Sequence, residues 1–193
     1  KWVKPTKIND LKVINPSNEE HFATISLGHE DDTNSAIKAA KKAFDKWKET
    51  SKEEKIVLLE KLLKIYKKRF DEMSNAISIE MGAPIDWSSS AQAASGQLHL
   101  EDFILRLKNF NFEKHFDSKS NNYINYEPIG VCGLITPWNW PINQIALKVI
   151  PALATGCTMI LKPSEIAPTS AMLFAEMIDE AGFPSGVFNL VNG

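Results

Sequence analysis

The last third of the chain limits the possible folds most, because short apolar runs alternate there with helical segments. The three apolar runs are nearly continuous, which is typical of strands buried on both faces of a sheet. Pro141 stands in the first turn of one helical segment, and Gly156 and Gly182 follow the ends of the two segments. The runs span residues 131–136, 157–161 and 187–191, and the helical segments span residues 141–155 and 169–181. This order predicts an α/β fold containing half of a doubly wound, Rossmann-like parallel sheet.

Polar residues follow the first two apolar runs, at the positions where ligands bind to sheets of this kind. Residues 136–139 follow the first run, and residues 162–165 follow the second. The carboxyl ends of parallel strands meet at one edge of the sheet, so we expect both groups to border one crevice. No GxGxxG sequence follows any run, so the usual pyrophosphate-binding fingerprint is absent and these residues alone leave the ligand open.

The preceding residues predict two strands and then a layer of amphipathic helices. From Asp31 onward apolar residues recur at the i, i+3, i+4 spacing of a helix face. The expected strands span residues 11–14 and 22–27, and the expected helices begin at Asp31, after Ser51, at Met73 and at about Asp86, the last reaching Leu107. We expect these helices to pack as a structural layer. A further strand at residues 123–126 stops at Pro128.

Composition excludes several classes of function. The net charge of −2 gives no basic surface for nucleic acid, and the lysines between Lys38 and Lys68 alternate with acidic residues as on a solvated helix face. No apolar stretch is long enough to span a bilayer. The two cysteines lie in apolar runs and the four histidines are scattered, so we expect neither a disulfide nor a metal site. A cytoplasmic protein without nucleic-acid or membrane partners is expected.

The region from residue 130 onward resembles the aldehyde dehydrogenase superfamily, whose members use NAD(P)+. The sequence GVCGLITPWNWP at residues 130–141 resembles the signature segment of that family. PALATGCT with LKPSE, and AGFP with GVFN, resemble the segments that follow it, in the same order and spacing. The resemblance covers essentially the whole chain but well under half of a typical member. The family's nucleophilic cysteine and general-base glutamate would lie outside these 193 residues.

Asn139 matches the family asparagine that donates an amide hydrogen bond to the oxyanion formed when the thiolate adds to the aldehyde. The resemblance therefore implies a catalytic role for Asn139, since a fixed donor stabilises developing negative charge. The alternative is a helix N-cap just before Pro141, which asparagine forms well. Both roles are compatible. Cys132 and Cys157 match no nucleophile segment, and we expect both to be core residues.

The resemblance also implies cofactor-binding residues. Lys162 and Glu165 would lie near the adenosine ribose, where a carboxylate can accept hydrogen bonds from both hydroxyls and repel a 2′-phosphate. NAD is therefore favoured, and NADP stays possible because the hydroxyl of Ser164 beside Lys162 could assist a phosphate. Lys162 could instead be an exposed strand-end lysine, and Glu165 could complement the dipole of the next helix. The residues expected to line the nicotinamide and ribose side are Ile135, Thr136, Pro137 and Trp138, with a core aromatic as the alternative for Trp138. Trp140 and Gln144 could face either a substrate channel or the core.

The resemblance implies three parts. Residues 1–122 would pack on the cofactor domain, residues 123–129 would form a bridging strand used in oligomerisation, and residues 130–193 would form the first half of the dinucleotide-binding domain, with the catalytic domain absent. The complete enzyme would oxidise an aldehyde as a homo-oligomer, either a dimer or a tetramer, and these residues alone would be inactive. The alternative is a truncated, inactive relative that acts as a binding or structural module.

Overall fold

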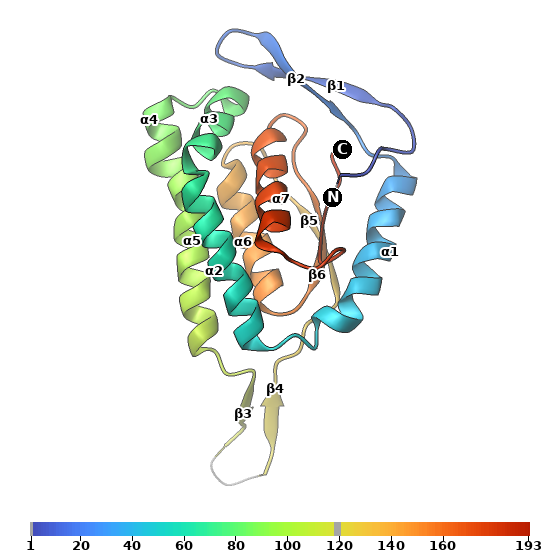
Figure 1. The fold of residues 1–193 in the computed structure, drawn as a ribbon, viewed down its shortest axis with the longest axis vertical. Helices are drawn as coiled ribbons and strands as arrows, with labels where there is room; N and C mark the ends of the chain where they lie inside the picture. Colours follow the sequence, from blue (N-terminus) through green and yellow to red (C-terminus); the bar gives the residue numbers. More distant parts are fainter. Residues whose placement is uncertain (1, 118–120) are drawn as a thin grey trace.

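A three-stranded parallel sheet forms the centre of the computed structural model, which describes residues 2–117 and 121–193 (Figure 1). The strands lie in the order β5-β6-β7. Val131 pairs with Thr158, and Met159 pairs with Phe188. The strands are β5 (Val131–Ile135), β6 (Thr158–Lys162) and β7 (Phe188–Leu190), and the connecting helices are α6 (Pro141–Ala154) and α7 (Thr169–Ala181). The predicted strand–helix–strand–helix–strand order and the α/β fold class are confirmed.

Helices cover both faces of this sheet. One face lies against α1 (Glu30–Trp47), and the other lies against α6 and α7 (Figure 1). Outside these two helices pack α2 (Lys52–Lys68), α3 (Phe70–Met81) and α5 (Ala94–Asn109). The core between the layers includes fully buried Leu59, Tyr66, Ile142, Leu153 and Phe174. Each such side chain contributes about 1.5–3 kcal/mol on burial, so the predicted helical layer is structural. Among the described residues no helix is long and apolar enough to cross a membrane.

The start of α2 and the end of α3 follow the predicted signals, whereas α3 begins at Phe70, three residues before the expected Met73. Before α2, the Ser51 hydroxyl accepts from the Glu54 backbone N–H at 3.2 Å, and the Glu54 carboxylate accepts from the Ser51 N–H at 3.0 Å. This capping box satisfies two donors that the first turn leaves free. At the other end of a helix, Gly82 closes α3 with a φ of +76°, which glycine adopts without steric cost.

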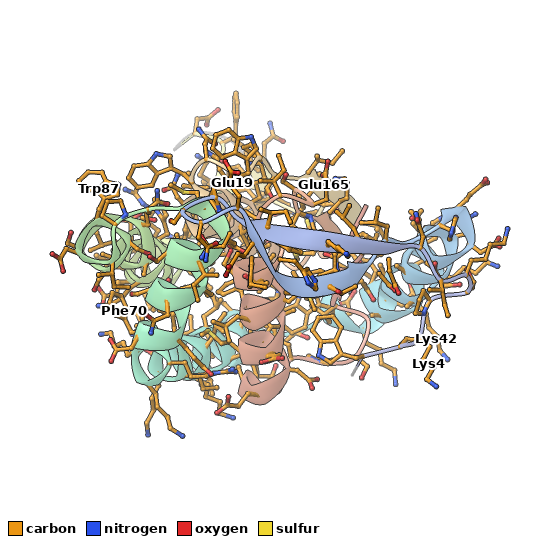
Figure 2. All side chains as sticks on the ribbon, turned by 90° about the horizontal axis from the view of Figure 1, so that it is seen from above. Lys4, Glu19, Lys42, Phe70, Trp87 and Glu165 are labelled. Atoms are coloured by element: carbon orange, nitrogen blue, oxygen red, sulfur yellow. The ribbon has the colours of Figure 1, made fainter. Side chains whose placement is uncertain are left out.

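Two antiparallel hairpins project from opposite ends of the layers (Figure 1). β1 (Asp10–Asn15) pairs with β2 (Glu20–Ser26), as predicted, and Figure 2 shows this hairpin lying across the end of the molecule that carries Glu165. β4 (Tyr123–Asn125) confirms the strand expected at residues 123–126. It pairs with β3 (Glu113–His115), which sequence reasoning missed because all three residues of β3 are exposed and carry no apolar alternation.

The helix expected from Asp86 to Leu107 is not one continuous α-helix. A single turn, α4 (Ile85–Trp87), leads into a π-helical segment, η1 (Ser88–Ala93), and then into α5. Serine hydroxyls bond to carbonyls along this stretch, because Ser90 donates to Asp86 O at 2.6 Å and Ser95 donates to Gln92 O at 2.7 Å. Such local bonds compete with the regular hydrogen bonds of an α-helix. The small residues of this stretch did not indicate from sequence that the α-helix would be interrupted.

The prediction that the first strand is buried on both faces is wrong for β5. Only β6 is almost entirely buried, whereas Ile135 of β5 is 70% exposed. The reason is topological, since β5 forms an edge of the described sheet and β6 is flanked on both sides. An apolar strand at an open edge is suited to pairing with further strand.

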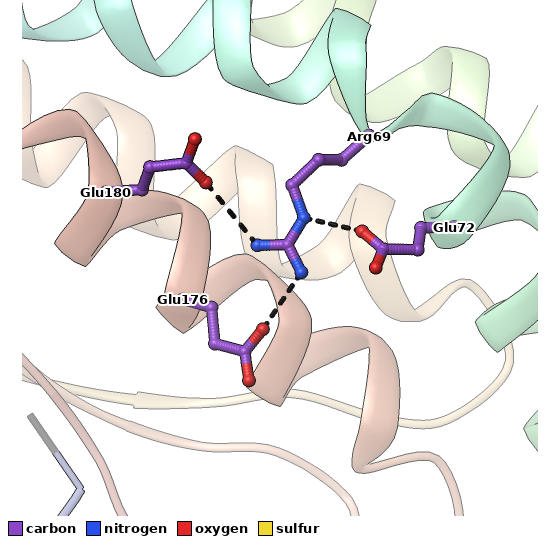
Figure 3. A network of polar contacts seen from close by, with 4 residues as sticks. All are labelled: Arg69, Glu72, Glu176 and Glu180. Atoms are coloured by element: carbon purple, nitrogen blue, oxygen red, sulfur yellow. Dashed lines mark hydrogen bonds and ion pairs between the residues drawn. The ribbon is translucent and has the colours of Figure 1, made fainter.

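An ion-pair network joins the start of α3 to α7 (Figure 3). The Arg69 guanidinium lies 2.5 Å from Glu72, 2.9 Å from Glu176 and 3.7 Å from Glu180, measured between nitrogen and carboxylate oxygen. The hydrogen bonds that Arg69 donates to Glu72 and Glu176 raise the pKa of Arg69 further above its ordinary value. One planar cation therefore fixes how the helical layer meets the last crossover helix.

Candidate functional site at the carboxyl ends of β5 and β6

The ends of β5 and β6 are tied together by the backbone. The N–H of Thr136 donates to the carbonyl of Lys162 at 3.2 Å. Thr136 itself is buried, and its hydroxyl has no hydrogen-bond partner within the part of the chain that the structure describes. Pro137 and Trp138, which follow, are exposed. At this edge of the sheet the buried Thr136 hydroxyl is therefore available to form a hydrogen bond with a ligand.

Asn139 is exposed and lies two residues before the start of α6. The N-cap alternative is wrong, because the capping position is Trp140, which makes no capping hydrogen bond with its side chain. Pro141 occupies the first helical position and has no N–H to satisfy, which lowers the need for a cap. The N-terminus of α6, two residues after Asn139, is the positive end of the helix dipole and favours a negative charge placed there.

Lys162, the last residue of β6, pairs with Glu165 in the turn that follows. The Lys162 ammonium lies 3.5 Å from a Glu165 carboxylate oxygen and donates to the Pro163 carbonyl at 3.1 Å. The dipole alternative for Glu165 is wrong, because α7 begins only at Thr169 and has no acidic residue in its first turn. Lys162 is partly buried, so it is not a fully exposed strand-end lysine.

Ser164 lies inside the turn that follows β6. It is 9% exposed, and its hydroxyl accepts a hydrogen bond from the Ile166 N–H at 3.3 Å. The side chain therefore stabilises the turn that carries Glu165. The sequence pattern did not distinguish this local role from contact with a ligand.

The aromatic residues near Asn139 are not core residues. Trp138 is 48% exposed, so the core alternative for it is wrong. Trp140 is partly buried and packs edge-on against Trp87, with 6.1 Å between ring centroids. Gln144 is partly buried and accepts a hydrogen bond from Lys148 at 3.0 Å. The sequence did not indicate a role for Trp87, because Trp87 is far along the chain from the loop that it contacts.

An apolar groove of about 510 Å³ lies between α1 and the sheet, and residues of β5, of β6 and from just after β7 line it. Ile135 and Lys162, both predicted site residues, line it. Thr33, Ile37 and Lys41 of α1 line the opposite side, and sequence reasoning assigned them no role because they match an ordinary amphipathic helix. The last residues of β5 and β6, Ile135 and Lys162, therefore border the same groove.

Comparison with known proteins decides the family. A family model described as the aldehyde dehydrogenase family matches residues 2–193. The chain belongs to the aldehyde dehydrogenase family. It is 49% identical over its whole length to a 3-succinoylsemialdehyde-pyridine dehydrogenase of a Pseudomonas species, of which it covers 40%. The chain thus spans about 40% of the length of that curated relative.

Solved structures agree with the assignment to aldehyde dehydrogenases. An aldehyde dehydrogenase from Bartonella henselae is 56% identical, with a TM-score of 0.98, and the match covers all of this chain and 41% of that one. A variant of aldehyde dehydrogenase C from Pseudomonas syringae, solved with NAD+ and octanal, is 41% identical with a TM-score of 0.96, and the match covers all of this chain and 39% of that one.

The two cysteines of this aldehyde dehydrogenase chain lie inside the fold. Cys157 is 4% exposed and Cys132 is partly buried. Burial, with a smaller contribution from neighbouring Cys157, raises the pKa of the Cys132 thiol to about 11. At neutral pH this thiol is therefore protonated and a poor nucleophile. The expectation of core cysteines is confirmed for Cys157 and holds in part for Cys132, since β5 is an edge strand.

Proposed function

We propose that the complete protein oxidises an aldehyde to a carboxylic acid with NAD+, through a thiohemiacetal on a cysteine outside this chain. Family membership over residues 2–193 supports the reaction class. The observation that carries the role of this chain is the exposed Asn139 in the loop between the end of β5 and the N-terminus of α6. The NAD+ and octanal bound to the Pseudomonas syringae relative are consistent with the same chemistry.

Asn139 acts on the oxygen of the reacting aldehyde. When a thiolate adds to the carbonyl carbon, negative charge develops on that oxygen. The Asn139 amide N–H donates to it, and the positive end of α6 stabilises the same charge. Loss of one such donor typically lowers the rate by about 10²–10³-fold.

The topology supports a cofactor site at the end of β5. In doubly wound sheets the second half adds beside the first strand of the first half, and ligands bind where the strand order reverses. β5 is the first strand of the order β5-β6-β7, and its outer edge is open in the described chain. The residues proposed to line the site are Ile135, Thr136, Pro137 and Trp138, and the unpaired Thr136 hydroxyl and the apolar groove beside Ile135 fit such a ligand. Bound NAD+ supplies an acceptor for the hydrogen and electron pair that leave the aldehyde.

Lys162 and Glu165 select the form of the cofactor. The Glu165 carboxylate is 47% exposed on its side chain, so it is available to accept hydrogen bonds from two ribose hydroxyls. Its negative charge repels a 2′-phosphate. It also pairs with the Lys162 ammonium, with 3.5 Å between the nitrogen and a carboxylate oxygen, so that this cation is less available to a phosphate. The hydroxyl of Ser164 accepts a hydrogen bond in the turn and keeps its own proton to donate, so it is the feature that leaves NADP+ as an alternative. NAD+ is therefore the proposed cofactor, and NADP+ is the weaker alternative.

We also propose that the protein is a homo-oligomer, either a dimer or a tetramer, through the bridging hairpin. An isolated two-stranded hairpin is marginally stable in water, and β3 with β4 projects away from the layers (Figure 1). The exposed aromatic residues Phe116 and Tyr123 favour burial of this hairpin against a second copy of the protein. Light scattering on the complete protein tests this, and a monomer would contradict it.

The direct test of the proposed function is the turnover of the complete protein with an aldehyde and NAD+, followed by formation of the reduced cofactor. Asn139→Ala is expected to lower kcat by about 10²–10³-fold with little change in cofactor affinity. Asn75→Ala, at an exposed position on α3, is the matched control and should keep wild-type turnover. Wild-type kcat in Asn139→Ala would overturn the role proposed for Asn139.

A further inference from the structure

The π-helical segment η1 makes a direct contact with the loop that carries Asn139. The side-chain N–H of Gln92 donates to the backbone carbonyl of Asn139 at 3.5 Å and also lies 3.3 Å from the sulfur of Met81. Gln92 is 1% exposed, and its side-chain oxygen has no hydrogen-bond partner among the described residues. A buried glutamine with half of its amide unsatisfied costs stability, which a core leucine or methionine would avoid.

η1 is held in place at both of its ends. The Ser88 hydroxyl donates to the Ser74 carbonyl of α3 at 2.6 Å, and the Tyr66 hydroxyl of α2 donates to the Ala93 carbonyl at 2.7 Å. Ser88, Tyr66 and Ala93 are fully buried. Gln92 therefore projects from a segment whose position is fixed by two other helices.

The same part of the chain also contacts the residue after Asn139. The ring of Trp87, directly before η1, packs edge-on against the ring of Trp140 at an interplanar angle of 75°. Two adjacent residues of one loop, Asn139 and Trp140, are thus contacted by Gln92 near the end of η1 and by Trp87 just before its start. A π-helical turn costs regular hydrogen bonding, and such turns occur frequently at functional sites.

We propose that Gln92 is a positioning residue for aldehyde oxidation, which holds the backbone of Asn139 so that its amide meets the developing oxyanion. This rests on the proposed function. The contact is at the long limit of a hydrogen bond, so Gln92 acts by restricting the orientation of the loop more than by the strength of one bond. Small displacements of a group that acts on the transition state have large effects on rate.

The test is a double-mutant cycle in the complete protein. Gln92→Met keeps the volume and removes the donor, and it is expected to lower kcat roughly tenfold with KM and NAD+ affinity nearly unchanged. In the Asn139→Ala background, Gln92→Met is expected to lower kcat no further, since the amide that it positions is gone. Gln97→Met, which removes a glutamine that bonds Glu101 on α5, is the matched control and should keep wild-type kcat.

Trp87→Leu provides a second variant that does not disturb the core, because Trp87 is 52% exposed. It is expected to show the same non-additivity with Asn139→Ala, with a smaller loss of kcat. Equal effects of Gln92→Met with and without the Asn139 side chain, or a lower Tm with unchanged kcat, would overturn the positioning role alone. Wild-type kcat in Asn139→Ala would instead overturn the proposed function of Asn139, and the positioning role with it.

Discussion

Glu80 at the end of α3 accepts a hydrogen bond from the backbone N–H of Thr169 at 2.6 Å, at the first residue of α7. The same carboxylate accepts from the Thr169 hydroxyl and from the N–H of Ser170. Glu80 is 1% exposed, so it satisfies free N–H groups of α7 in a place that water does not reach. The helical layer therefore caps a crossover helix of the cofactor-binding sheet.

The stability contributed through Glu80 depends on pH. Burial raises the pKa of the Glu80 carboxyl above its ordinary value. The folded protein thus keeps the proton at a pH where the unfolded chain has lost it, and this stability is lost as pH rises through the raised pKa. Glu80→Gln cannot ionise, so its Tm relative to wild type is expected to increase as pH rises through that window. Glu53→Gln, at an exposed residue, is the control, and parallel Tm curves for Glu80→Gln and wild type would contradict this account.

The Arg69 network is expected to stabilise the fold more than an ordinary surface pair does. Arg69→Met loses contacts to three carboxylates from a side chain that is 20% exposed, and a loss of about 1 kcal/mol is expected after solvent screening. Arg106→Met is the matched control, because Arg106 is 70% exposed and its ion pair among the described residues is with Asp102 of the same helix, so a smaller loss of stability is expected. Denaturant unfolding of both variants at low and high salt measures the difference. Equal losses would contradict a special role for the network.

Local patterns predicted the parallel sheet and its crossovers because each element carries its own signal. Gly156 and Gly182 end helices, and apolar runs mark β5 and β6. The features that the sequence did not predict depend on contacts between distant residues. The bond between Glu80 and Thr169 joins residues 89 positions apart, and the contact between Gln92 and Asn139 joins residues 47 positions apart. Neither pair has a spacing rule that periodicity could detect.

The site residues divide in the same way. Asn139, Lys162 and Glu165 lie at or after strand ends, so topology alone predicts that they share one edge of the sheet. Their local alternatives were decided only by where helices begin, since α6 starts at Pro141 and α7 starts at Thr169. The sequence locates the ends of a helix only to within one or two residues. A shift of that size decides whether a polar residue caps the helix or is available to bind a ligand.

Neither cysteine of this chain is expected to be the nucleophile. Because the pKa of Cys132 is raised to about 11, little thiolate is present at neutral pH, and the fraction should increase only as pH rises towards that value. Cys132→Ala is expected to keep kcat within about threefold of wild type in the complete protein. Alkylation followed by mass spectrometry should show slow modification of Cys132 at neutral pH. Complete loss of turnover in a folded Cys132→Ala protein would place the nucleophile in this chain.

The cofactor site is tested most directly by calorimetric titration of the complete protein with NAD+ and with NADP+. Wild type is expected to bind NAD+ more tightly, and Glu165→Gln is expected to weaken NAD+ about tenfold, the equivalent of about 1.4 kcal/mol, while strengthening NADP+. Glu53→Gln should leave both affinities unchanged. Equal NAD+ affinity in wild type and Glu165→Gln would contradict a cofactor site at the end of β6.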